Sequence, residues 1–403
     1  MPFDLSRRRL IGVAASGGAA LLLPGCATSE RGPSVPVGEA NQATVLGIPN
    51  ERFFPYTGLA PLEAEFNAAV VRLHRTLGVP ANGVMPEMHL LALSGGGENG
   101  AFGAGLLCGW TEHGGRPTFE LVTGISAGSL IAPFAYLGSA YDEQLRSVYM
   151  QLSPDKVLSK RGITAALFDD ALTDNQPLFK TISSYMTEDI RAAIATAYDQ
   201  GRLLLVATTD LDAQQPVFWN IGAIAKSGHP RALDTIRRVL LASAAMPSIF
   251  PPSMIDVTLN GKRYQEMHVD GGALAQTFLY PAPLMAQRQE RMSRGEPVIR
   301  LQAYIIRNGR LDPQGSDVER RTLPIAERAI STMTTASGFN DVMRIYNNTQ
   351  RDGIGFNLAY IGTDFTQKLP QPFDPGYMRA LFDYGYQQGR SGYDWAHKPP
   401  FFA

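Results

Sequence analysis

A short apolar strand that runs through a glycine-rich turn into a helix occurs repeatedly in this chain from about residue 88 onward. Residues 89–93 and 120–123 are the clearest examples, and residues 203–209 form a strand that is apolar on both faces. Such a strand belongs in the interior of a parallel sheet whose two faces are covered by helices. The pattern therefore predicts an α/β fold, a three-layer α/β/α sandwich with a central, mostly parallel sheet.

The remaining elements follow from similar patterns. Asn260-Gly261 separates two alternating runs and predicts a β-hairpin. Helices are expected at residues 61–77, 232–244, 324–346 and 375–388, and later strands at 301–306 and 356–361. The expected organisation is a signal peptide (1–25), a lipid-anchored linker (26–60), an amphipathic docking helix (61–87), a core (88–300) and C-terminal strands and helices that complete the same domain (301–403).

Composition excludes several classes of function. The 403 residues include 36 Lys and Arg against 37 Asp and Glu, and this balance provides no basic surface for nucleic acid. Two cysteines are too few for a disulfide scaffold or a thiolate metal site, and Cys108 is expected to be buried in an apolar helix. Asp210 and Asp212 have no histidine or cysteine cluster beside them in the sequence. We therefore predict no metal and no cofactor.

The N-terminus resembles an export signal. Three arginines at positions 7–9 precede an apolar run over residues 10–23, which is too short to span a bilayer as a helix. The run ends in Leu-Pro-Gly-Cys, which resembles the lipobox of bacterial lipoproteins, and the arginines resemble a twin-arginine signal. The resemblance implies that Cys26 is acylated and anchors an exported protein in the cell envelope, on the periplasmic side or in the outer membrane. An ordinary secretory peptide with an incidental cysteine is the alternative.

Two glycine-rich turns carry candidate chemistry. Gly124-Ile125-Ser126-Ala127-Gly128 fits the G-x-S-x-G pattern, in which small neighbours allow a serine to occupy a strained turn between strand and helix. The segment from Gly95 to Gly100 lets backbone N–H groups converge on an anion. That anion is an oxyanion in acyl transfer or a pyrophosphate in a dinucleotide site. The dinucleotide alternative is weaker, because Glu120 begins the next strand where an acidic residue is required at its end.

A third motif, His268-Val269-Asp270-Gly271-Gly272, closes the strand that follows the hairpin. An aspartate at a strand end with two glycines behind it is well placed to reach a serine on a neighbouring strand. A Ser-Asp-His triad in the usual order would need His397, which lies in a proline-rich tail. His268 shares a strand face with Asp270, and we expect it to have a packing or supporting role.

Together these motifs, in this order, resemble the patatin-like phospholipase family. Residues 207–211 and 243–247 fit the same family, so the resemblance extends over about residues 88–272. It implies a serine-aspartate lipid acyl hydrolase, a phospholipase A or lysophospholipase-like esterase, without a cofactor. Ser126 would be the nucleophile and Asp270 the general base, with an oxyanion hole formed by Gly95, Gly96, Gly97 and Ala127.

One position departs from the family's pattern. Asn99 stands where the family usually has Arg or Lys, which bears on rate or substrate preference but leaves the backbone donors in place. A non-catalytic, membrane-anchored lipoprotein that binds lipid on the same fold is the alternative function.

Overall fold

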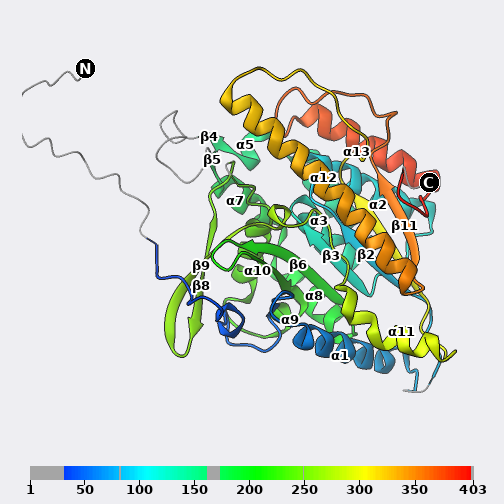
Figure 1. Cartoon of the computed structure of the whole chain (residues 1–403). Coiled ribbons are helices and arrows are strands. Elements are labelled where there is room, and N and C mark those ends of the chain that lie inside the picture. The colour runs from blue at the N-terminus through cyan, green and yellow to red at the C-terminus, as the bar shows by residue number, and fades with distance from the viewer. Residues whose placement is uncertain (1–30, 81–82, 161–172, 248, 401–403) are drawn as a thin grey trace, which may run out of the picture. The chain divides into compact units, whose positions relative to one another are not determined.

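The computed structural model describes residues 31–80, 83–160, 173–247 and 249–400 (Figure 1). The expected signal peptide, Cys26 and the two phenylalanines at 401–402 lie outside the described residues. Gly32–Ala403 is one compact unit, and the following description concerns that unit. Among the described helices, none combines the length and the apolar character needed to cross a bilayer.

Nine strands of the described residues form the central sheet. Five neighbouring strands, in the order β6-β3-β2-β10-β11, run parallel to one another. Strands β7 and β9 pair antiparallel with β6, β1 pairs antiparallel with β7, and β8 forms a hairpin with β9. The strands are β1 (Arg52–Phe53), β2 (Met88–Leu93), β3 (Leu121–Ile125), β6 (Leu203–Asp210), β7 (Gln215–Asn220), β8 (Ser253–Leu259), β9 (Lys262–Asp270), β10 (Leu301–Arg307) and β11 (Gly355–Tyr360).

Helices cover both faces of this sheet, so the three-layer α/β/α sandwich is confirmed. Alternate side chains of each strand enter two separate cores, as the two-residue period of a strand requires. In β2, Leu91 and Leu93 pack with α2, α3, α10 and α13, whereas Leu90 and Ala92 pack on the face covered by α1 and α12. These helices are α1 (Ala60–Leu77), α2 (Gly100–His113), α3 (Ala127–Leu137), α10 (Ala232–Ser243), α12 (Thr322–Arg351) and α13 (Pro375–Arg390).

Helices α2 and α13 approach each other closely because each presents two glycines one turn apart. A Cβ atom added to Gly105 or Gly109 would lie 2.1 Å from a backbone carbonyl oxygen of α13. Added to Gly385 or Gly389, it would lie 2.4 or 2.5 Å from a carbonyl oxygen of α2. The glycines on both helices therefore remove the side chains that would separate the two backbones. This contact fixes α13 against the segment that follows the Gly-rich turn.

The structure adds elements that the patterns did not predict. They are α4 (Asp142–Gln151), α5 (Pro154–Val157), α7 (Gln176–Tyr185), α8 (Glu188–Asp199), α9 (Ile221–Lys226), α11 (Ala286–Ser293), strands β1 and β7, and the two-residue strands β4 (Ser159–Lys160) and β5 (Thr173–Asp174). Part of the expected linker also differs. Val35, Ala43 and Leu46 are buried against the body, and Arg52 is held inside it by Glu266. The described residues 32–59 therefore pack on the domain because their apolar side chains find a place in its core.

Candidate active site

Ser126 lies in a sharp turn between the end of β3 and the start of α3. Its backbone has φ 54° and ψ −128°, a conformation that non-glycine residues rarely adopt and that functional sites retain. A Cβ atom on Gly124 would lie 2.7 Å from the Gly128 carbonyl oxygen, and one on Gly128 would lie 2.3 Å from that of Leu93. Both glycines of the motif are therefore required by close packing around the turn.

The segment at residues 243–247 holds this turn in place. The Ser126 N–H donates to the Ser243 hydroxyl (3.1 Å), which donates in turn to the Ala207 carbonyl (2.7 Å). The Ala245 carbonyl accepts from the Asp270 N–H (2.9 Å). One loop thus positions the backbones of both Ser126 and Asp270, although it is far from each in sequence.

Asp270 ends β9, beside β6, and its side chain reaches the turn that holds Ser126. The carboxylate is buried, with the residue 4% exposed, and accepts a hydrogen bond from the Gly272 N–H (2.7 Å). Burial raises the pKa of Asp270 to about 6, although the neighbouring Ser126 hydroxyl and the Gly272 N–H oppose the shift. The structure therefore brings the predicted serine and aspartate together and makes the carboxylate more basic than a solvated one.

The Gly-rich loop lies directly against Ser126. A Cβ atom on Gly95 would be 3.1 Å from the Ser126 Cβ, and one on Gly96 would be 2.0 Å from the Asn308 carbonyl oxygen. The Gly95 N–H donates to the Gln276 carbonyl (2.9 Å), so Gly95 provides space rather than the expected oxyanion donor. Within the described part of the chain, the N–H groups of Gly96, Gly97 and Ala127 have no acceptor. These three remain available for an anion.

Two residues that the sequence patterns missed anchor this loop from the end of β10. Arg307 donates to the Ser94 hydroxyl and the Gly95 carbonyl, each at 3.2 Å. Asn308 donates to the Ser94 carbonyl (2.8 Å) and accepts from the Gly103 N–H (3.0 Å). Burial lowers the pKa of Arg307 to about 10, and no carboxylate of the described residues forms an ion pair with it. Their position in the sequence could have indicated them, because both stand at the end of an apolar strand, and ligands of parallel sheets bind at the carboxyl ends of the strands.

Asn99 points toward α13 and not into the turn. Its side-chain oxygen accepts a hydrogen bond from the Tyr377 hydroxyl (2.7 Å). The position at which the family usually carries a cation is therefore used here to fasten the loop to a C-terminal helix. A cation does reach the loop from elsewhere, because Arg307 donates to the Gly95 carbonyl.

His268 lies in a buried polar cluster behind the site. Its Nδ1 contacts the Thr208 hydroxyl (2.9 Å) and its Nε2 contacts Glu266 (3.0 Å), so both ring nitrogens are engaged there. Potential metal-ligand atoms of Asp210, Glu266 and His268 lie within 4.8 Å of one another, a juxtaposition that sequence spacing concealed. Although burial raises the pKa of Glu266, Arg52 and His268 lower it to about 2. The Arg52 guanidinium thus already supplies the cation, and the cluster is a structural ion pair.

His397, the histidine that a triad would require, contacts the Phe356 carbonyl (3.2 Å) at β11. It is separated from Asp270 by several strands, since β9 pairs with β6, and β3, β2 and β10 lie between β6 and the edge strand β11. Cys108 is buried, as expected, and burial raises the pKa of its thiol to about 12.

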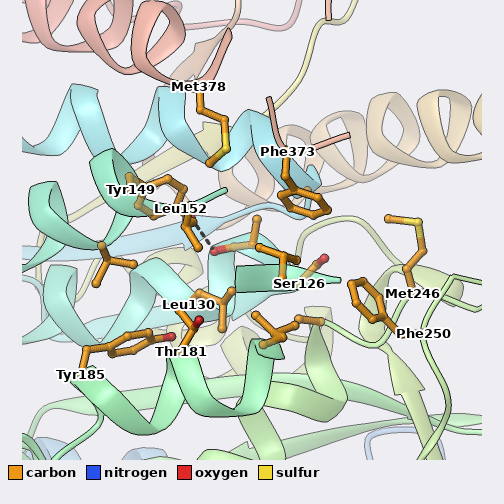
Figure 2. A pocket seen from close by; sticks show the side chains of 16 residues that line it. Ser126, Leu130, Tyr149, Leu152, Thr181, Tyr185, Met246, Phe250, Phe373 and Met378 are labelled. Carbon is orange, nitrogen blue, oxygen red and sulfur yellow. Dashed lines mark hydrogen bonds between the residues drawn. The ribbon is translucent and has the colours of Figure 1, made fainter. Parts of the chain in front are cut away.

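Ser126 opens into a cavity of about 50 Å³ that is partly open to solvent (Figure 2). Its walls come mainly from α3, α4, α5 and α7, and also from Ala244, Met246, Phe250, Phe373 and Met378. Most of the lining is apolar, including Leu130, Val148, Leu152, Val157 and Leu178. The apolar lining suits a hydrocarbon chain.

The fold and the site define a three-layer α/β/α protein with a strained serine beside a buried aspartate and a Gly-rich anion loop. Residues 91–283 match the family model described as patatin-like phospholipase, and the matched segment contains Ser126, Asp270 and the loop. The family supports a lipid hydrolase activity in general terms. No match was found among curated proteins.

Among solved structures, the chain is similar to a crystal structure of VipD from Legionella pneumophila, with 14% identity and a TM-score of 0.31. The similarity covers 75% of this chain and 66% of that chain, so it spans just under two thirds of the length of VipD.

Proposed function

We propose that this protein is a serine-aspartate lipid acyl hydrolase that cleaves ester-linked acyl chains, of the phospholipase A or lysophospholipase type. The observation that carries the proposal is the buried Asp270 carboxylate, whose pKa is influenced by the neighbouring hydroxyl of Ser126 in its strained turn. The apolar cavity beside Ser126 supports an acyl chain as the group that is bound. The patatin-like phospholipase match supports the lipid class.

In the first half-reaction, the Ser126 Oγ attacks the ester carbonyl carbon while its proton passes to Asp270. The carbonyl electron pair moves onto oxygen, and the N–H groups of Gly96, Gly97 and Ala127 stabilise the resulting oxyanion. The C–O bond then breaks, and Asp270 returns the proton to the leaving alcohol. In the second half-reaction, water gives a proton to Asp270 and attacks the acyl-serine, which releases the fatty acid and restores the Ser126 hydroxyl.

The environment of Asp270 suits this role. A carboxylate with an ordinary pKa is a weak base, whereas a pKa of about 6 keeps Asp270 mostly ionised at neutral pH and still basic enough to share the serine proton. Because the carboxylate is buried, bulk water does not compete for that proton.

The direct test is labelling with a fluorophosphonate probe, combined with hydrolysis of p-nitrophenyl acyl esters. Ser126→Ala and Asp270→Asn should each abolish turnover, and the double variant should be hardly worse because the two residues act as a unit. His268→Ala should keep most of its activity if it folds, and metal chelators should have no effect. Normal turnover by Asp270→Asn would refute the assignment of the base. A wild-type chain that binds lipid but neither labels nor hydrolyses would instead support the non-catalytic alternative.

Anchoring is a second part of the proposal and rests on sequence alone. We propose that Cys26 is acylated and holds the mature protein on a membrane of the cell envelope. Cys26→Ser should release the protein from the membrane fraction. Mass spectrometry that found an unmodified Cys26 within an uncleaved chain would contradict it.

A further inference from the structure

The apolar cavity beside Ser126 contains a polar spot on α7. Thr181 and Tyr185 line the cavity and are four residues apart on this helix, so their side chains share one face. Figure 2 shows them on one side of Ser126, with Met246 and Phe250 on the other. The neighbouring lining residues Leu130, Val157 and Leu178 are hydrocarbon. A chain that enters from Ser126 along α7 therefore meets the hydroxyl groups of Thr181 and Tyr185, while the Tyr149 hydroxyl in the same lining donates to the Ala127 carbonyl.

The Tyr185 hydroxyl is buried and, among the described residues, has no hydrogen-bond partner. Burial and the neighbouring Tyr149 raise the pKa of Tyr185 far above its ordinary value, so the group stays protonated and is a permanent donor. Buried polar groups in folded proteins are nearly always paired, and an unpaired one calls for a partner that the protein itself does not supply. Since Tyr185 lines the cavity, a molecule bound there beside it is in a position to supply that partner.

Thr181 offers the complementary function. Its hydroxyl donates to the Lys156 carbonyl (2.9 Å), which uses its single hydrogen and leaves the oxygen lone pairs as acceptors. The pair thus presents one donor, from Tyr185, and one acceptor, from Thr181. A hydroxyl group is the small group that both accepts and donates, whereas a ketone oxygen only accepts and a methylene does neither.

We propose that the cavity selects acyl chains that carry a hydroxyl group, which accepts a hydrogen bond from Tyr185 and donates one to Thr181. This inference rests on the proposed function, because the chain reaches the cavity as an ester attacked at Ser126. An unsubstituted chain would leave the Tyr185 hydroxyl unpaired beside hydrocarbon. Sites built around a buried polar group discriminate strongly against analogues that lack its partner.

The test compares p-nitrophenyl dodecanoate with its hydroxylated derivatives, the hydroxyl being moved along the chain, and with the matching oxo ester. For at least one position, wild type should prefer the hydroxylated ester in kcat/KM by about tenfold, as expected for one net neutral hydrogen bond. Tyr185→Phe should reduce that ratio to near one. Thr181→Val should reduce the preference for the hydroxyl ester but not for the oxo ester. Tyr264→Phe, a partly buried tyrosine on β9 outside the cavity, is the matched control.

Stability gives an independent readout of the unpaired hydroxyl. Tyr185→Phe should unfold at the same temperature as wild type or at a higher one, because it removes a polar group that has no partner. A clear loss of thermal stability would mean that the hydroxyl is already paired, for example with a buried water, and would overturn the proposal.

The kinetic outcomes separate this inference from the function beneath it. Equal kcat/KM for plain and hydroxylated esters at every position, or a preference that Tyr185→Phe leaves intact, would overturn the hydroxyacyl proposal while Ser126-dependent hydrolysis stands. Should Tyr185→Phe not fold, the wild-type ratio and Thr181→Val still decide. If wild type hydrolyses neither ester above the Ser126→Ala background, the proposed function fails, and the selectivity proposal fails with it.

Discussion

The Asp270→Asn substitution should abolish hydrolysis and raise the stability of the fold, and the gain in stability should depend on pH. In the folded chain the pKa of Asp270 is about 6, raised by burial from its ordinary 3.8. A group whose pKa is raised on folding contributes stability that is full below the unfolded pKa and is lost as the pH rises through the folded one. The shift of roughly two pH units corresponds to about 3 kcal/mol, of which about 2 kcal/mol separates pH 8 from about pH 4.5.

The measurement is the free energy of unfolding in urea for wild type and Asp270→Asn at those two pH values. An amide has no charge to bury, so the stability of the variant relative to wild type should be about 2 kcal/mol greater at pH 8 than near pH 4.5. Asp383→Asn, on the exposed side of α13, is the control and should follow wild type at both pH values. If the difference in unfolding free energy between Asp270→Asn and wild type is the same at both pH values, the argument that burial makes Asp270 basic is refuted.

Three further outcomes follow from the geometry. The kcat/KM for ester hydrolysis should rise about tenfold per pH unit up to about pH 6 and then level off, as Asp270 ionises; a flat profile would contradict this base. Gly96→Ala places a Cβ atom 2.0 Å from the Asn308 carbonyl oxygen and should lower kcat about 100-fold or more, while near-normal turnover would exclude Gly96 as an oxyanion donor. Arg52→Met leaves Glu266 buried and unpaired and should cost about 3–5 kcal/mol in urea unfolding, most of it recovered when Glu266→Met is added.

The central sheet was predictable because its strands are recognisable from their own short sequences. Strand β6 is buried along its whole length, and its apolar residues on both faces correctly predicted that it lies inside the sheet. Strand β7 carries no such signal, since it contains Pro216 and draws its order from pairing with β6 and β1. Helix α8, by contrast, has a recognisable start in the sequence. Thr187 precedes two acidic residues and accepts from the Ile190 N–H, which is a helix N-terminal cap.

In the candidate site, too, the parts that depend on local sequence were predictable and the parts that depend on long-range contacts were not. The turn that holds Ser126 and the end of the strand at Asp270 are specified by their own glycines, so motifs alone located them. Gly95 was misjudged because its N–H bonds to Gln276, a partner far along the chain. Long-range contacts of this kind follow from the fold and not from spacing. The ion pair of Arg52 and Glu266 could not be predicted for the same reason, since 214 residues separate the two partners.

The working unit extends past the residues that match the patatin family. That match ends at residue 283, yet Arg307 and Asn308 at the end of β10 hold the Gly-rich loop, and Tyr377 on α13 fastens it through Asn99. Met378, next to Tyr377, lines the cavity itself. Arg307 bonds to the carbonyl of Gly95, and the next two N–H groups have no acceptor among the described residues, so the buried charge of Arg307 acts on the peptide that leads to these open donors. Arg307, Asn308 and Tyr377 thus hold the loop without a cation at position 99.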